Sequence, residues 1–265
     1  PVLLVCWLRR IPSIIFSGDA ALGWATRMMA PLTTKATIAF DEARDQISGT
    51  PTQLTGYPIR PAFASPDPAA GRLLGNVRGH RPLVLVMGGS QGAHAINEAL
   101  KLDLELLLER VHVVHISGRN DYDGLETVRV QLPDDQRHAY ELHEFVSDGF
   151  ANLLAAADIV ISRAGATSVA ELSAVGAASI LIPGTFGKGH QVATATAIAT
   201  AGAATMLLES QLVPGKLTKT LFDLLDHPEK INHMRQASRA RGKPDAADVL
   251  ATLSLELALP TTRTS

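Results

Sequence analysis

The sequence predicts an α/β fold in which parallel β-strands alternate with helices. From Pro82 onward, short apolar stretches of strand length alternate with longer helical segments, a pattern typical of a parallel sheet with helical connections. The first stretch, Leu83–Met87, is apolar throughout, as expected of a strand buried on both faces. Glycine-containing turns follow three of the predicted strands, and such sheets bind ligands at those ends.

The composition is that of a globular protein with one large domain or two modest ones. The chain has 265 residues, 46% hydrophobic and 19% charged, which supplies a sizeable core and argues against disorder. Net charge is −2 and aromatic residues make up 5%. Because neither a basic surplus nor a set of stacking aromatics is present, no nucleic-acid partner is expected.

The start of the chain is unusual. Residues 1–8 are uncharged, and the basic Arg9 and Arg10 follow them, whereas a signal peptide carries its basic residues first. Eight residues also fall far short of the ~20 that span a bilayer. We therefore expect the chain to begin inside a domain, as a truncated form. Cys6, the single cysteine, favours a reducing compartment and is interpreted as a buried apolar filler.

The first 60 residues alternate short helices and strands. A loose helical face ends at Ile11-Pro12, and a helix over Ala20–Ala30 is stopped by Pro31. Strands are expected at Ser13–Phe16, Ala36–Phe40 and Gln53–Thr55. Residues 61–80, rich in proline and glycine, are predicted to form a linker.

The remainder, residues 81–265, contains the regular alternation. Strands are expected at Leu83–Met87, Val111–Ile116, Tyr140–His143, Ile159–Ser162, Ser179–Ile182 and Ala204–Leu207. Helices are expected at Ala93–Leu108 and at about Gly149–Ala156. A further helix follows the turn at Ser162–Thr167 and ends at Val175, and two more are expected over 190–200 and 216–225.

Three turns at strand ends are candidate ligand-binding elements. Gly88–Gly92 and Ser162–Thr167 each lead from a strand into a helix, whose free N–H groups and partial positive charge can bind an anion. The third, Pro183–Gln191, is a loop ahead of a helix. A tight turn that only packs, or an ordinary surface loop, remains an open alternative at each.

Glu171 has two open interpretations. Its carboxylate can accept two hydrogen bonds from a ribose diol, or it can be a first-turn acid that complements the helix dipole. Thr167 or Ser168 is expected to cap the same helix. His112 and His115 should face opposite sides of a strand and form no metal pair, and the D-x-D pattern at Asp121–Asp123 is interpreted as a solvated turn.

Several motifs, in this order, resemble those of one enzyme family. They are GYPIR (Gly56–Arg60), VLVMGGSQGAHAIN (Val84–Asn97), HEFV (His143–Val146), ADIVISRAGATSVAELSAVGAASILIP (Ala157–Pro183) and HQ (His190-Gln191). The family is MurG, the UDP-N-acetylglucosamine (UDP-GlcNAc) transferases that make lipid II on the cytoplasmic side of the bacterial membrane. The resemblance covers roughly residues 1–250.

The resemblance implies a GT-B fold, with two Rossmann-like domains and the active cleft between them. Residues 1–60 would be the end of the N-terminal, acceptor- and membrane-side domain. Residues 61–80 would be the linker, and residues 81–265 the complete UDP-sugar donor domain with a C-terminal tail.

The resemblance also implies a donor site without a metal ion or cofactor. Arg60 and Ser90 would contact the donor, with Ser90 near the diphosphate, and Val146 would read the uracil edge through its backbone. Glu171 would hold the ribose and Gln191 the GlcNAc hydroxyls. The diphosphate turn would be lined by Ala166, Thr167, Ser168 and Val169, with Ala170 also counted among the donor-binding residues.

The sequence departs from the family pattern in its N-terminal part. The family's first loop, G-G-T-G-G-H, carries the expected catalytic base and has no counterpart here, so no catalytic residue is assigned. The family's H-E-Q-N segment reads Phe16-Ser17-Gly18-Asp19, and the Asn of its G-N-P-V-R motif is Tyr57.

The function implied is inverting transfer of GlcNAc from UDP-GlcNAc to the C4 hydroxyl of MurNAc in lipid I, the undecaprenyl-linked acceptor. The product is lipid II, used in peptidoglycan synthesis, and the expected location is peripheral, on the cytoplasmic face of the cell membrane. Two alternatives remain open. One is a related GT-B transferase that uses another UDP-sugar, and the other is a UDP-sugar-binding module that is non-catalytic or completed by a partner chain.

Overall fold

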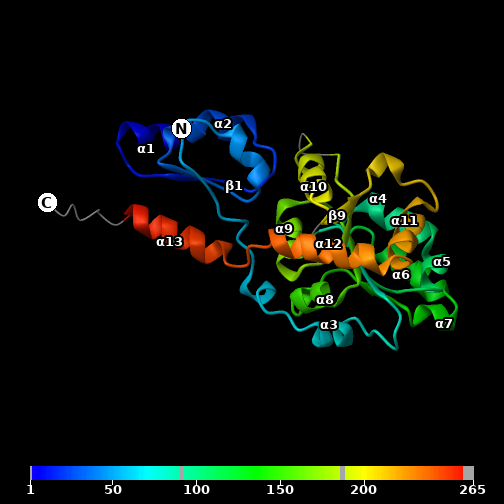
Figure 1. Ribbon diagram of the computed structural model, residues 1–265. Coiled ribbons are helices and arrows are strands. Elements are labelled where there is room, and N and C mark those ends of the chain that lie inside the picture. The colour runs from blue at the N-terminus through cyan, green and yellow to red at the C-terminus, as the bar shows by residue number, and fades with distance from the viewer. Residues whose placement is uncertain (1, 90–91, 186–188, 259–265) are drawn as a thin grey trace. The chain divides into compact units, whose positions relative to one another are not determined.

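The computed structural model describes residues 2–89, 92–185 and 189–258. The chain forms two compact units. The first unit comprises Pro1–Arg60 together with Lys243–Ser265, and the second comprises Pro61–Gly242 (Figure 1). The C-terminal segment, expected with the donor domain, therefore groups with the N-terminal residues.

The first unit is built on a three-stranded parallel sheet in the order β1-β2-β3, and the three strands that the sequence predicts are all present. Its core is small, with Leu22, Ile38 and Ala43 at the centre. The helix expected over Ala20–Ala30 is shorter, because Gly23 is extended and forms the N-cap. The elements are α1 (Val2–Leu8), β1 (Ile14–Ser17), α2 (Trp24–Met29), η1 (Ala30–Leu32), β2 (Lys35–Ile38), η2 (Asp41–Gln46), β3 (Thr52–Leu54) and α13 (Ala246–Ala258).

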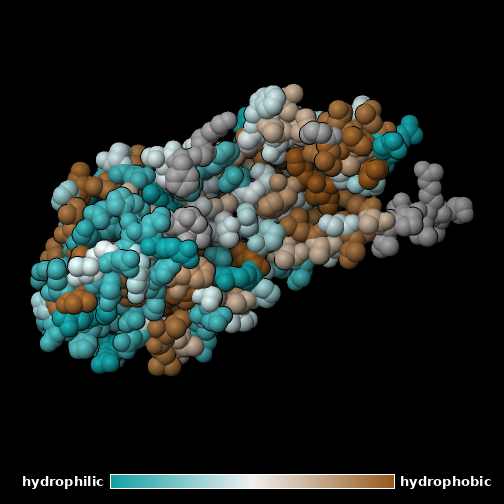
Figure 2. Space-filling model, turned by 180° about the vertical axis from the view of Figure 1, so that it is seen from behind, coloured by the Kyte–Doolittle hydropathy of each residue, from teal (hydrophilic) through white to brown (hydrophobic). Residues whose placement is uncertain are grey.

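Exposed apolar side chains are concentrated on the first unit, which carries much of the brown surface in Figure 2. Helix α1 has no buried residue. The large exposed apolar side chains of this unit are Val2, Leu4, Val5, Trp7, Leu8, Ile11, Phe16, Trp24, Met28 and Leu255. None of the helices within the described residues is long and apolar enough to cross a membrane.

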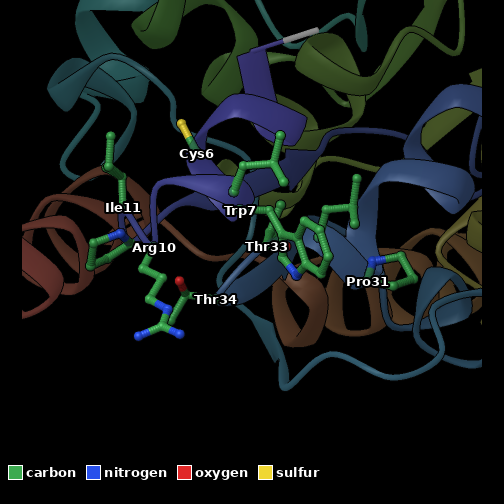
Figure 3. Close-up of a pocket in the computed structure, with 10 residues that line it drawn as sticks. Cys6, Trp7, Arg10, Ile11, Pro31, Thr33 and Thr34 are labelled. Carbon is green, nitrogen blue, oxygen red and sulfur yellow. The ribbon is translucent and has the colours of Figure 1, made fainter.

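A pocket of about 580 Å³ lies between α1 and η1 in the same unit. Figure 3 shows residues that line it, among them Cys6, Trp7, Arg10, Pro31 and Thr33. Cys6 is only half-buried. The interpretation of Cys6 as a buried filler is therefore wrong, because α1 packs too little of its surface to cover the thiol.

The second unit contains a six-stranded sheet in the order β6-β5-β4-β7-β8-β9, with every neighbouring pair parallel. All six predicted strands are present. The strands are β4 (Leu83–Met87), β5 (His112–Ile116), β6 (Tyr140–His143), β7 (Ile159–Ser162), β8 (Ser179–Leu181) and β9 (Ala204–Met206). The helices are η3 (Pro61–Phe63), α3 (Pro68–Leu74), α4 (His94–Leu102), α5 (Leu104–Leu108), α6 (Tyr122–Gln131), α7 (Asp134–Arg137), α8 (Phe150–Ala156), α9 (Ala166–Val175), α10 (His190–Thr200), η4 (Glu209–Gln211), α11 (Lys216–Leu225) and α12 (Pro228–Arg241).

Helices cover both faces of this sheet. Right-handed crossovers put the helices that follow β4 and β5 on one face and those that follow β7 and β8 on the other. On the first face, Val84 and Val86 pack with Ile96, Leu100 and Leu221 from α4 and α11. On the other face, α8 packs against α3 and α9. The central strands are consequently fully buried.

The segment 61–80, expected to be a linker, is ordered and belongs to the second unit. Asp67 caps α3 by accepting hydrogen bonds from the N–H groups of Ala69 and Ala70, and Gly71 allows α3 to lie directly against the backbone of Asn152 in α8. Pro68 is the first residue of α3, and Gly71 permits the close packing of α3 against α8.

The helix expected over Ala93–Leu108 is two helices, α4 and α5, which meet at Asp103. The Asp103 carboxylate accepts hydrogen bonds from the Gly215 N–H (2.9 and 3.2 Å) and the Thr218 hydroxyl (2.8 Å). Asp103 therefore serves the start of α11 rather than its own helix.

Candidate functional site

The strand order of the second unit defines a ligand-binding edge. Numbered along the chain, the six strands have the order 3-2-1-4-5-6, which reverses direction between β4 and β7. In open parallel sheets a crevice lies outside the carboxyl ends of the strands at this switch point. Met87 pairs with Ser162 at those ends, so the structure brings together the first two of the three turns that the sequence singled out, Gly88–Gly92 and Ser162–Thr167.

The turn after β4 requires its glycines for close packing. A Cβ at Gly88 would lie 2.2 Å from the Ala93 nitrogen, and one at Gly92 would lie 2.4 Å from the Ser117 carbonyl oxygen. Gly89 and Gly92 also have φ values of +85° and +76°, a region that side chains disfavour. Ser90, predicted to contact the diphosphate, lies outside the described residues, as does Gln91.

A chain of buried polar groups anchors the helix that follows this turn. Asn97 of α4 donates hydrogen bonds to the Ser117 carbonyl (2.9 Å) and to Asp121 (2.7 Å), so its amide oxygen is left to accept from His115 Nε2 (2.9 Å). His115 Nδ1 then accepts from the Tyr140 hydroxyl (2.8 Å). These bonds fix the His115 tautomer, and burial lowers the pKa of His115 to about 3.

The Asp121–Asp123 pattern is not the solvated turn that was expected. The Asp121 side chain is only 18% exposed, because its two oxygens contact Asn97 and His94 Nδ1, the latter at 2.9 Å. The bond to Asp121 raises the pKa of His94. Asp123 alone is exposed.

The turn after β7 leads directly into α9. Gly165 is its N-cap and has extended backbone geometry, with no side-chain cap hydrogen bond. The prediction that Thr167 or Ser168 caps this helix is wrong, because the helix starts at Ala166 and both residues already lie in its first turn. The first-turn N–H groups of Ala166, Thr167 and Ser168 therefore point out of the helix start, as an anion requires.

The other residues predicted for this turn lie deeper in α9. Val169 is buried (1% exposed) and its N–H donates to the Gly165 carbonyl at 2.9 Å, so it supplies no free donor, and Ala170 is half-buried. Glu171 is the sixth residue of α9, and no acidic residue lies in the first turn. The first-turn dipole interpretation of Glu171 is therefore wrong. Its side chain is 9% exposed, which is rare for a carboxylate and points to a specific role.

Gln191 lies one strand further along the edge, in the first turn of α10. Its amide oxygen accepts a hydrogen bond from the Gly184 N–H at 2.8 Å, which joins the end of the loop after β8 to its start. In this loop Phe186, Gly187 and Lys188 are outside the described residues.

Val146 and Arg60 stand apart from the two central turns. Val146 is half-buried and follows β6, the edge strand two places from β4. From β6 to β8 the edge covers four strand spacings, about 19 Å. It presents Val146, the glycine turns and Gln191 in that order. Arg60 belongs to the first unit, and its part in the site stays a prediction.

The two departures from the family pattern in the first unit contact each other. The rings of Phe16 and Tyr57 meet edge to face with centroids 5.6 Å apart. Gly18 leaves room for this pair, since a Cβ there would lie 2.6 Å from the Tyr57 ring. An aromatic contact therefore occupies positions where the family pattern has polar side chains.

Sequence reasoning missed two residues that brace the site. Arg163, in the turn after β7, contacts Glu209 of η4 through two N–O distances of 3.2 and 3.3 Å and also donates to the Ile182 carbonyl at 3.3 Å. Arg163 was visible in the motif, but its partner lies 46 residues further on, and no local pattern connects them.

Within the described parts of the chain, no group of three or more His, Cys, Asp or Glu residues could hold a metal ion. His112 and His115 do lie apart. His112 Nε2 contacts the Gly75 carbonyl oxygen at 2.8 Å, while His115 bonds to Asn97 and Tyr140.

Comparisons with known proteins agree with this geometry. Residues 83–250 match the model of the glycosyltransferase family 28 C-terminal domain. Two UDP-N-acetylglucosamine--N-acetylmuramyl-(pentapeptide) pyrophosphoryl-undecaprenol N-acetylglucosamine transferases are similar: that of Myxococcus xanthus is 37% identical over 98% of this chain and 67% of its own length, and that of Salinibacter ruber 35% identical over 97% and 69%.

Solved structures show the same fold. The crystal structure of Acinetobacter baumannii MurG superposes with a TM-score of 0.75 at 24% identity, covering 96% of this chain and 69% of that one. The calicheamicin glycosyltransferase CalG4 gives 0.63 at 16% identity, covering 97% and 71%.

The doubly wound sheet, together with the match to the glycosyltransferase family 28 C-terminal domain, makes this chain a glycosyltransferase of the GT-B fold. Within that class, the chain belongs to the MurG family of UDP-N-acetylglucosamine--N-acetylmuramyl-(pentapeptide) pyrophosphoryl-undecaprenol N-acetylglucosamine transferases.

Proposed function

We propose that this protein transfers GlcNAc from UDP-GlcNAc to the C4 hydroxyl of the MurNAc in lipid I, giving lipid II for peptidoglycan synthesis. Family membership supports the reaction. Within the second unit, one observation supports the donor site: Glu171, a buried carboxylate, lies one turn inside a helix that starts at the switch point of the sheet.

The donor site follows the edge of the sheet. The backbone of Val146 reads the uracil, and Glu171 accepts hydrogen bonds from the ribose diol. A helical side chain leans toward the N-terminus of its helix, so the carboxylate of Glu171 reaches back toward the first turn of α9. The diphosphate binds the N–H groups of Ala166, Thr167 and Ser168 and of the turn after β4. Gln191 binds the GlcNAc hydroxyls.

The reaction is a direct displacement with inversion. The acceptor oxygen forms a bond to C1 of GlcNAc while the bond from C1 to the diphosphate oxygen breaks, and UDP leaves with the electron pair. The acceptor proton passes to a general base, to which no described residue is assigned. The starts of α4 and α9 stabilise the negative charge that develops on the leaving diphosphate, because their N–H groups are already oriented toward it.

We also propose that the protein works peripherally on the cytoplasmic face of the cell membrane, where a lipid-linked acceptor is held. The exposed apolar side chains of the first unit, with Arg9, Arg10 and Arg27 exposed on the same unit, support this. Flotation with vesicles that contain anionic lipid tests it: the chain should float with the vesicles at low salt. A chain that stays in solution at every lipid composition would contradict the location.

Calorimetry with UDP-GlcNAc and UDP tests the donor site. Glu171→Gln should weaken binding of both by about 1–3 kcal/mol, the range for a hydrogen bond to a charged group. Glu98→Gln is the matched control, because Glu98 is the fifth residue of α4 and is well exposed, and it should leave binding unchanged.

The same measurements separate the alternatives. Competition with UDP-galactose and UDP-glucose distinguishes a transferase for another sugar, and transfer to lipid I distinguishes an enzyme from a binding module. Absence of heat up to millimolar UDP-GlcNAc would contradict the donor site.

A further inference from the structure

Strand β7 has an arginine–carboxylate pair at each end. At the amino end, Arg235 of α12 contacts Asp158, which directly precedes the strand, at 3.2 Å. At the carboxyl end, Arg163 contacts Glu209 at 3.2 and 3.3 Å. Only the second pair lies at the ligand-binding edge.

The Arg163–Glu209 pair joins the ends of three neighbouring strands. Arg163 directly follows β7, the carbonyl group of Ile182 directly follows β8, and Glu209 opens η4 just after β9. The guanidinium is 11% exposed and the carboxylate 25%. A guanidinium that meets a carboxylate through two nitrogens has a fixed direction as well as a fixed distance.

The pair also sets where α9 begins. Only Ala164 and Gly165 separate Arg163 from the first residue of α9. Ala164 is fully buried, and the Arg163 carbonyl accepts a hydrogen bond from the Ser162 hydroxyl at 2.8 Å. Because both its backbone and its side chain are hydrogen-bonded, Arg163 restricts the conformation of the turn. This restriction also fixes the direction of the N–H groups at the start of α9.

Stability alone is a weak explanation for such a pair. The free energy needed to remove two charges from water is about as large as their electrostatic attraction. A largely buried ion pair therefore adds little to the free energy of unfolding. A fixed geometry next to a binding turn is a more specific benefit, because preorganised donors bind an anion without a further ordering cost.

We propose that Arg163 and Glu209 are positioning residues for the diphosphate-binding turn of α9. They act on the pyrophosphate part of the nucleotide and leave recognition of the nucleoside unchanged. This inference rests on the proposed donor site. It treats the arginine as a brace for backbone N–H groups, in contrast to a direct cationic contact with phosphate.

Calorimetry of the full chain with UDP, and competition with uridine, test the inference. The variants are Arg163→Gln, Arg163→Lys and Glu209→Gln, with Arg235→Gln as the matched control from the other end of β7. Arg163→Gln and Glu209→Gln should each weaken UDP binding about tenfold, the equivalent of one charge-assisted hydrogen bond, with uridine binding unchanged. Arg163→Lys should fall between wild type and Arg163→Gln, and Arg235→Gln should bind both ligands as wild type does.

Each other outcome overturns the inference in a recognisable way. Tighter UDP binding by Glu209→Gln would mean that a released arginine contacts phosphate directly. Equal losses for UDP and uridine would indicate general loosening of the fold, as would a loss of UDP affinity in Arg235→Gln. A wild-type chain that binds no UDP contradicts the proposed function itself. Thermal melts show which variants are folded. If Arg163→Gln does not fold, the UDP and uridine affinities of Arg163→Lys and Glu209→Gln test the inference.

Discussion

Acidification should destabilise the second unit through one residue, His115. The imidazole is fully buried between Asn97 and Tyr140. Burial lowers its pKa from 6.5 to about 3. Because the folded state binds this proton more weakly than the unfolded state, the contribution of His115 is fully present above pH 6.5. It is lost progressively as the pH falls from 6.5 toward 3.

The size of this loss follows from the two pKa values. It amounts to about 5 kcal/mol when complete and about 2 kcal/mol at pH 5. Protonation would also leave Nδ1 unable to accept from the Tyr140 hydroxyl, so this bond between β5 and β6 would have to reverse, with Nδ1–H donating to Tyr140 Oη. His112, whose pKa burial also lowers, acts in the same direction, whereas His94, whose pKa Asp121 raises, acts in the opposite one.

Urea denaturation of wild type and His115→Gln isolates the effect, since glutamine can donate to Asn97 and accept from Tyr140 without titrating. Between pH 7.5 and 5, wild type should lose about 2 kcal/mol more of its unfolding free energy than the variant. The imidazole resonances of His115 should not shift between these pH values. A His115 ring that titrates near pH 6.5, or a variant whose stability falls as steeply as that of wild type, would refute the reasoning.

Three further substitutions test how the second unit is built, each by urea denaturation. Gly92→Ala should cost at least about 1–2 kcal/mol, because the residue has φ +76° and its Cβ would meet the Ser117 carbonyl; unchanged stability would mean that the turn relaxes freely. Asp103→Ala should cost about 1–2 kcal/mol through the lost cap of α11, with Asp103→Asn intermediate. Gly71→Ala should cost about 1–3 kcal/mol because its Cβ would lie 2.1 Å from the Asn152 carbonyl oxygen, whereas Gly124→Ala, a helical site with nothing within 4 Å, should gain about 0.5–1 kcal/mol; equal effects would contradict the packing argument.

The positions of the strands along the chain were predictable from the sequence, because a buried strand needs apolar residues at its buried positions. A strand covered on both faces, such as Leu83–Met87, must be apolar at nearly every position. The edge strand Tyr140–His143 is instead buried at alternate residues, and all six strands of the second unit were nevertheless predicted. Helix ends were harder. Periodicity continues through Asp103, and only the position of Gly215, 112 residues away, explains why α4 stops there.

The candidate site was predictable where its chemistry is local. The two glycine turns each connect one strand to the next helix, so their role as a pair needed only the strand order, and the switch point supplied it. Glu171 was found as a carboxylate near a helix start. Of its two interpretations, the one that places it a turn inside the helix agrees with the structure, because α9 begins at Ala166.

What the sequence could not show is the bracing of the site, and this follows from the kind of recognition involved. The groups expected to bind the diphosphate are mainly backbone N–H groups, in turns rich in small residues whose own side chains do little to orient them. Side chains elsewhere in the fold support these turns through hydrogen bonds: Asn97 and His115 at one turn, and Arg163 and Glu209 at the other. These partners come from different elements of the sheet, so local patterns cannot join them. A motif such as GGSQGA therefore predicts an anion site, while we expect residues outside the motif to influence how tightly it binds.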